Sequence, residues 1–129
     1  MIAILSPTGR ALPVSSAEQF RRLVQLRWDY ADFVEQPLRD GVTDVQVDVP
    51  TTDGRGIRIY HAADGQSISS DDRAYRFEIA EWACTWTSEN DDFIMLDIDT
   101  DHIVKLAPGL TASELEAMEQ PADWDKLTS

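Results

Sequence analysis

TDVQVDV (residues 43–49) and IRIYH (residues 57–61) alternate apolar and polar side chains on either side of PTTDGRG (residues 50–56). Alternation of this kind is typical of a β-strand with one buried and one solvent-facing side, because successive side chains point to opposite faces. The segment between the two runs is rich in turn-forming residues, and its glycines can adopt a positive φ. Residues 43–61 therefore predict an antiparallel β-hairpin.

A long helix is predicted before this hairpin, over residues 16–36. Its apolar side chains recur at helical spacing, and Ser15 and Glu18 have the spacing of a capping box. Pro37 and Gly41 are residues that end helices. We expect this helix to be the main covering of the sheet.

Shorter patterns complete the chain. Apolar runs predict strands at residues 2–5, 93–98 and 102–106, and residues 63–72 are typical of a polar loop. Either Thr111 or Ser113 is suited to cap a last helix that continues to about Glu119, before Pro121.

Residues 74–86 fit two structures. Tyr75, Phe77 and Ile79 alternate as in a strand, and the apolar side chains from Ala80 to Trp86 alternate on the opposite parity, which a β-bulge would reconcile. A helix is the alternative, because several of the same side chains also recur every three to four residues. The aromatic and β-branched content favours the strand.

The whole pattern predicts one α+β domain that spans residues 1–129. We expect an antiparallel meander sheet of four to five strands, with one long N-terminal helix packed on a face and a short C-terminal helix. One helical layer leaves the other face of the sheet open unless the sheet curls or a partner covers it.

The charge is strongly negative and unevenly distributed. The chain has a net charge of −13 at neutral pH. Residues 1–60 hold seven basic and eight acidic side chains, whereas residues 61–129 hold four basic and sixteen acidic ones. Such a field repels nucleic acid and anionic membranes and attracts basic protein surfaces. The alternative interpretation is that the acidic residues serve solubility alone.

The sequence predicts a cytoplasmic protein. Cys84 is the only cysteine, so no intramolecular disulfide can form. The first residues lack the basic segment and the long apolar run of a signal peptide, and no apolar stretch is long enough to span a bilayer.

Asp97, Asp99 and Asp101 have the alternating spacing of calcium ligands. The EF-hand pattern nevertheless fails, because His102 stands where glycine is required and Pro108 stands where a bidentate glutamate is required. No histidine or cysteine pair has zinc-ligand spacing. We therefore expect neither a metal nor a cofactor.

No motif for catalysis is present either. The sequence has no nucleophile elbow, P-loop or dinucleotide-binding fingerprint, and His61 falls on the inward side of its predicted strand, where a hydrogen-bonded core histidine is expected. A pair of Cys84 with a histidine stays possible as a nucleophile, although a buried, inert thiol is the commoner outcome. We expect a protein that is not an enzyme.

The predicted function is that of an acidic protein-binding module. Its profile is similar to that of bacterial immunity proteins and phage-encoded inhibitors, in which carboxylates can take the place of DNA phosphates against a basic, nucleic-acid-handling enzyme. The expected contact residues are the loop and turn carboxylates and one aromatic anchor: Asp91, Asp92, Asp97, Asp99, Asp101 and Trp86. Trp82 and Trp86 fit a core role equally well. The alternative function is a structural or accessory subunit, such as a phage particle component, and the sequence does not indicate an oligomeric state.

Overall fold

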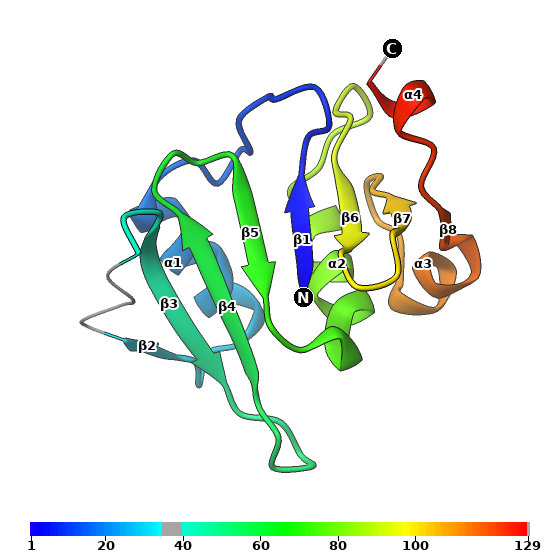
Figure 1. Ribbon diagram of the computed structural model, residues 1–129. Coiled ribbons are helices and arrows are strands. Elements are labelled where there is room, and N and C mark those ends of the chain that lie inside the picture. The colour runs from blue at the N-terminus through cyan, green and yellow to red at the C-terminus, as the bar shows by residue number, and fades with distance from the viewer. Residues whose placement is uncertain (35–39, 129) are drawn as a thin grey trace.

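The computed structural model describes residues 1–34 and 40–128, which form a mixed α+β fold around one antiparallel sheet (Figure 1). Across these residues the sheet has eight strands in the order β2-β3-β4-β5-β1-β6-β7-β8. The strands are β1 (Ile2–Leu5), β2 (Asp32–Val34), β3 (Thr43–Val49), β4 (Ile57–Ala62), β5 (Ser67–Ser70), β6 (Ile94–Asp97), β7 (His102–Lys105) and β8 (Gln120–Pro121). The helices are α1 (Ala17–Arg27), the 3-10 helix η1 (Arg73–Tyr75), α2 (Arg76–Cys84), α3 (Ala112–Met118) and α4 (Trp124–Leu127). The predicted antiparallel α+β class is confirmed, but four to five strands and two helices were too few. The sheet is also not a simple meander, because β1 lies between β5 and β6.

The N-terminal strand holds the two halves of the sheet together. β1 lies between β5 and β6 and is antiparallel to both of them. β5 and β6 therefore run parallel to each other, and η1 and α2 make the crossover between them. Figure 1 shows α1 and α2 behind the same face of the sheet. The main core lies between these helices and the sheet, and Ile2, Ile4, Ile68 and Met95 fill it from the sheet side.

The predicted hairpin is confirmed. β3 and β4 are antiparallel, with Val47 opposite Ile59 and Val45 opposite His61, and both glycines of the connecting turn have positive φ. The segments predicted as strands at residues 2–5, 93–98 and 102–106 form β1, β6 and β7.

The prediction of a long N-terminal helix over residues 16–36 is wrong in the length of the helix. α1 ends at Arg27, and residues 32–34 instead form β2, which pairs with β3 at the edge of the sheet. The chain turns after α1 at Trp28. This side chain is only 7% exposed, because its ring packs against the ring of Trp82 with 5.6 Å between the ring centroids. Phe33 then lies opposite Val47, a pairing that a helix would not allow. The predicted end of the helix at residues 35–36, and Pro37, lie outside the described residues.

The capping box of α1 also begins one residue later than predicted. Ser16 accepts a hydrogen bond from the amide of Gln19 at 3.2 Å, and the Gln19 side chain accepts one from the Ser16 amide at 3.3 Å. The helix predicted to end near Glu119 is α3, which begins with an equivalent box between Thr111 and Glu114, and the sequence did not predict α4 after it. The prediction that named Thr111 as one of two caps is confirmed.

Residues 74–86 form a helix rather than the favoured strand. Six of the nine residues of α2 are buried, because the helix is enclosed by the sheet on one side and contacts other helices elsewhere. A helix that is apolar on most sides has little amphipathic periodicity, so the strand-like alternation was misleading. The indole of Trp82 donates a hydrogen bond to the carbonyl of Leu23 at 3.1 Å and so joins α2 to α1.

Residues 63–72 are not a loop throughout, since Ser67–Ser70 forms β5. This strand carries only one large apolar side chain, Ile68, which is fully buried between His61 and Ile4 on the neighbouring strands. Its serines gave no strand signal in the sequence.

Candidate protein-binding surface

Most of the acidic side chains in the C-terminal half are at the surface. Ten of the sixteen are exposed: Asp64, Asp71, Glu78, Glu89, Asp99, Asp101, Glu114, Glu116, Asp123 and Asp125. Both arginines of this half are paired with carboxylates, Arg73 with Asp97 at 2.7 Å and Arg76 with Glu119 at 3.0 Å. The surface of this half is therefore strongly acidic.

Asp97 does not belong to this surface. Its side chain is fully buried on the helix-covered face of the sheet, where it accepts a hydrogen bond from Nε of Arg73 at 2.8 Å. Burial alone would raise the pKa of Asp97, but the hydrogen bond and positive charge of Arg73, with smaller help from Thr100 and the Asp99 amide, outweigh it and lower that pKa. The role of Asp97 is to hold η1 against β6.

Asp99 and Asp101 lie in the exposed turn between β6 and β7. The Asp99 carboxylate accepts a hydrogen bond from the N-terminal ammonium group at 2.7 Å. Asp101 has a φ of 54°, in the left-handed region, and its Oδ1 accepts a hydrogen bond from the indole of Trp124 at 3.1 Å. The three aspartates of the Asp-x-Asp-x-Asp triplet thus bind three different groups. Among the described residues, no cluster of three histidine, cysteine, aspartate or glutamate side chains is arranged to hold a metal ion.

Asp91 and Asp92 lie at the opposite end of β6. Asp92 accepts hydrogen bonds from the hydroxyls of Ser6 at 2.7 Å and Thr8 at 2.5 Å, whereas Asp91 accepts one from the amide of Ser88 at 2.8 Å. Burial raises the pKa of Asp92, and the two hydroxyls lower it further than burial raises it. A strand of four residues, about 13 Å long, separates this loop from the β6–β7 turn. The structure therefore does not bring the two predicted groups of carboxylates together.

Trp86 is largely a core side chain. Its ring makes edge contacts with Trp82 at 5.5 Å and Phe93 at 6.3 Å between centroids. Its indole nitrogen is buried and has no hydrogen-bond partner among the described residues. The side chain as a whole is only partly buried, so the contact role predicted for Trp86 stays a prediction.

Trp124 is the exposed tryptophan of the acidic half, and the sequence analysis did not select it. Its side chain is 37% exposed on α4, and its indole is held by Asp101. The amide of Ala122 also donates to the carbonyl of Asp101 at 2.9 Å, so the segment before α4 is fixed to the β6–β7 turn. Four exposed carboxylates belong to this turn and to α4 with its cap residue. We call these carboxylates and the tryptophan together the Trp124 surface: Asp99, Asp101, Asp123, Trp124 and Asp125.

A signal for this surface was present in the sequence. Asp123-Trp124-Asp125 places an aromatic side chain between two carboxylates, and Asp123 is also an N-cap residue, which accepts the amide of Lys126 at 3.3 Å. The cap indicated that the tail is ordered rather than frayed.

The remaining candidate groups are buried. His61 is fully buried, with Nδ1 2.6 Å from Oδ1 of Asp44 and Nε2 2.7 Å from the carbonyl oxygen of Val14. This arrangement confirms the hydrogen-bonded core histidine. Cys84 is also buried, and burial raises the pKa of its thiol, which lowers the fraction of reactive thiolate.

No family model matches the chain, and neither a curated protein nor a solved structure is similar to it. In the part of the chain that the structure describes, the helices are too short or too polar to cross a membrane. The function is therefore argued from the surface itself.

Proposed function

We propose that this protein is a non-enzymatic binding module that covers a basic surface of another protein, as an inhibitor or immunity-type protein does. The observation that carries the proposal is the Trp124 surface, in which a partly exposed indole lies among exposed carboxylates. Tryptophan is among the residues that contribute most to protein interfaces, and a surrounding ring of polar groups is typical of such anchors.

The geometry of the anchor supports this role. A hydrogen bond from the indole to Asp101 and a backbone hydrogen bond from Ala122 hold Trp124 in place before any partner binds. Prior ordering reduces the entropy that is lost on association, so more of the contact energy appears as affinity. The carboxylates around the indole suit lysine and arginine side chains of a partner, and they can replace DNA phosphates if that partner handles nucleic acid.

Capture from a lysate at low and high salt tests the proposal. Asp99→Lys with Asp125→Lys reverses two charges on the Trp124 surface, and Asp29→Lys with Asp32→Lys reverses two exposed charges in the other half of the chain. We leave Asp101 unchanged because it holds the indole.

The wild type and the Asp29/Asp32 variant should capture the same basic proteins at low salt, and the Asp99/Asp125 variant should not. Capture should weaken as salt increases, because the contact is electrostatic. Equal capture by both variants would contradict the proposed surface. For a purified partner, the association rate should fall for the Asp99/Asp125 variant and lose most of its salt dependence.

A structural or accessory subunit is the second candidate, and exposed apolar side chains favour it. Leu26 is 74% exposed and Tyr30 is 59% exposed, both near the C-terminal end of α1 in the half with balanced charge. An interface there would be apolar and would depend little on salt. Loss of capture with Leu26→Ser and Tyr30→Ser, together with capture that resists high salt, would favour this function over the first.

A further inference from the structure

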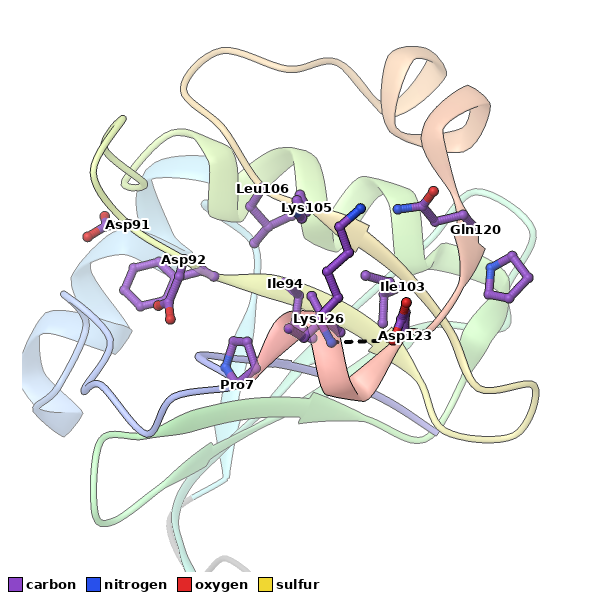
Figure 2. A pocket seen from close by; sticks show the side chains of 13 residues that line it. Pro7, Asp91, Asp92, Ile94, Ile103, Lys105, Leu106, Gln120, Asp123 and Lys126 are labelled. Carbon is purple, nitrogen blue, oxygen red and sulfur yellow. Dashed lines mark hydrogen bonds between the residues drawn. The ribbon is translucent and has the colours of Figure 1, made fainter. Parts of the chain in front are cut away.

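A cavity of about 460 Å³ lies between α4 and the loop that carries Asp91 and Asp92 (Figure 2). Ile94 of β6 and Ile103 of β7 lie at its base, and both side chains are already almost fully buried. These side chains point away from the helix-covered core, because side chains alternate along a strand and the neighbouring residues Met95 and Val104 belong to that core. The volume is within the range of small-molecule sites in proteins, about 300–1,000 Å³.

Charges of opposite sign lie at different parts of this cavity. Lys105 and Lys126 are the only lysines in the sequence, and both line it. Figure 2 shows Asp91 and Asp92 on one side of the base and the two lysines, with Asp123, on the other. The lysine side thus carries two positive charges and one negative charge, and the opposite side carries two negative charges.

The charged groups of the lining differ in whether they already have hydrogen-bond partners within the protein. Hydroxyl groups of Ser6 and Thr8 fix the carboxylate of Asp92, which still has lone pairs to accept an ammonium group. The Lys105 side chain is exposed, and no hydrogen bond or ion pair to its ammonium group occurs within residues 1–34 and 40–128. Lys105 therefore offers a donor that the fold itself does not use.

We propose that this cavity binds a short apolar peptide in its zwitterionic form. The peptide's carboxylate lies toward Lys105 and Lys126, its ammonium group lies toward Asp91 and Asp92, and its apolar side chains fill the cavity between these charges. A simple anion would meet the three carboxylates of the lining, and a simple cation would meet both lysines. Only a ligand with both charges, separated along an apolar body, matches the whole lining.

Three dipeptides test this assignment: Leu-Leu, N-acetyl-Leu-Leu, which lacks the ammonium group, and Leu-Leu amide, which lacks the carboxylate. Binding is followed by methyl NMR of Ile94 and Ile103 during titration of the full chain. We expect Leu-Leu to shift these methyl signals with a Kd on the order of 1 mM, as is usual for a ligand of this size. Each blocked peptide should bind about two- to fivefold more weakly, which is the effect of losing one partly exposed ion pair.

The variant Lys105→Gln separates the contribution of the carboxylate. In this variant Leu-Leu and Leu-Leu amide should bind with nearly equal affinity, whereas Arg22→Gln, an exposed cation on α1, should leave the difference unchanged. The proposal is overturned if no peptide shifts the two isoleucine signals, or if a blocked peptide binds as well as Leu-Leu to the wild type. The cavity and the Trp124 surface share Asp123, but the two tests change different residues: Lys105 lines the cavity alone, and Asp99 and Asp125 belong to the Trp124 surface alone.

Discussion

Asp97 counts toward the negative net charge of the chain, but its side chain lies in the core and not on the surface. It is the only one of the sixteen acidic side chains in residues 61–129 that is buried, and its partner Arg73 reaches it from the segment between β5 and α2. A buried carboxylate is tolerated only with a partner of this kind, because an unpaired charge in the interior is strongly unfavourable. Net charge by itself therefore does not identify surface residues.

The low pKa of Asp97 makes its contribution to stability dependent on pH. A carboxyl group whose pKa is lower in the folded state stabilises the fold above its ordinary pKa of 3.8, and this contribution disappears as the pH falls through the folded value. Asp97→Asn should reduce the free energy of unfolding at pH 7 by about 2 kcal/mol, the usual value of a hydrogen bond to a charged group. The difference from the wild type should shrink below pH 4. Urea unfolding of both proteins at pH 7, 4 and 2.5 measures this, and a difference that is constant with pH would contradict it.

At the scale of the secondary-structure elements, the N-terminal cap of α1 gives a direct test of the register. Ser16, not Ser15, bonds the Gln19 amide, and the Ser15 hydroxyl makes only a long contact of 3.4 Å with the Gln19 side chain. Ser16→Ala should lower the free energy of unfolding by about 1 kcal/mol, whereas Ser15→Ala should change it by a few tenths at most. Urea denaturation of the two variants provides the measurement. A larger loss for Ser15→Ala would place the cap where the sequence first indicated it.

The elements that could be predicted are those whose pattern is local. Alternating valines define β3, and a cap residue defines the start of α3, so both were recognised from the sequence. Trp28 ends α1 by packing against Trp82, which is 54 residues away, and no local pattern records such a contact. In the same way, β5 is a strand because it pairs with β1 on one side and with β4 on the other, and these strands are distant from one another in the sequence.

The candidate surface follows the same rule. The turn that carries Asp99 and Asp101 was recognised because it follows an apolar strand, and the acidic excess was visible in the composition. The choice of Trp86 as anchor depended on its lying in an exposed strand, whereas it follows a buried helix and packs against Phe93. Trp124 could be proposed as an anchor only from its exposure and its hydrogen bond to Asp101, which is distant in the sequence.

For the whole molecule, the helices are divided between the two faces of the sheet. α1 and α2 cover one face of the sheet, while α4 and its cavity lie over β6 and β7 on the other (Figures 1 and 2). The central position of β1 ties both halves into one sheet, so the N-terminal ammonium group lies against Asp99 in the β6–β7 turn. The β6–β7 turn and its exposed carboxylates are therefore joined directly to the sheet that carries the core.

The uneven charge also predicts how the stability of the free protein responds to salt. With a net charge of −13, repulsion among exposed carboxylates destabilises the fold at low ionic strength. Salt also weakens the surface ion pairs, such as Arg58 with Asp48, but exposed pairs of this kind contribute only about 0–1 kcal/mol each. We expect the relief of repulsion to be the larger effect, because acidic side chains outnumber basic ones by more than two to one.

Raising sodium chloride from about 10 mM, where the Debye length is about 30 Å, to about 300 mM should therefore increase the melting temperature. A gain of about 1 kcal/mol corresponds to roughly 4 °C for a domain of this size. Glu116→Lys with Asp125→Lys, which removes repulsion in the acidic half, should raise the melting temperature at low salt and reduce the further gain from salt, as scanning calorimetry can measure. The Asp29→Lys and Asp32→Lys variant changes the net charge equally in the balanced half and should have the smaller effect. A melting temperature that falls with salt in the wild type would contradict this prediction and would mean that ion pairs outweigh repulsion in the folded protein.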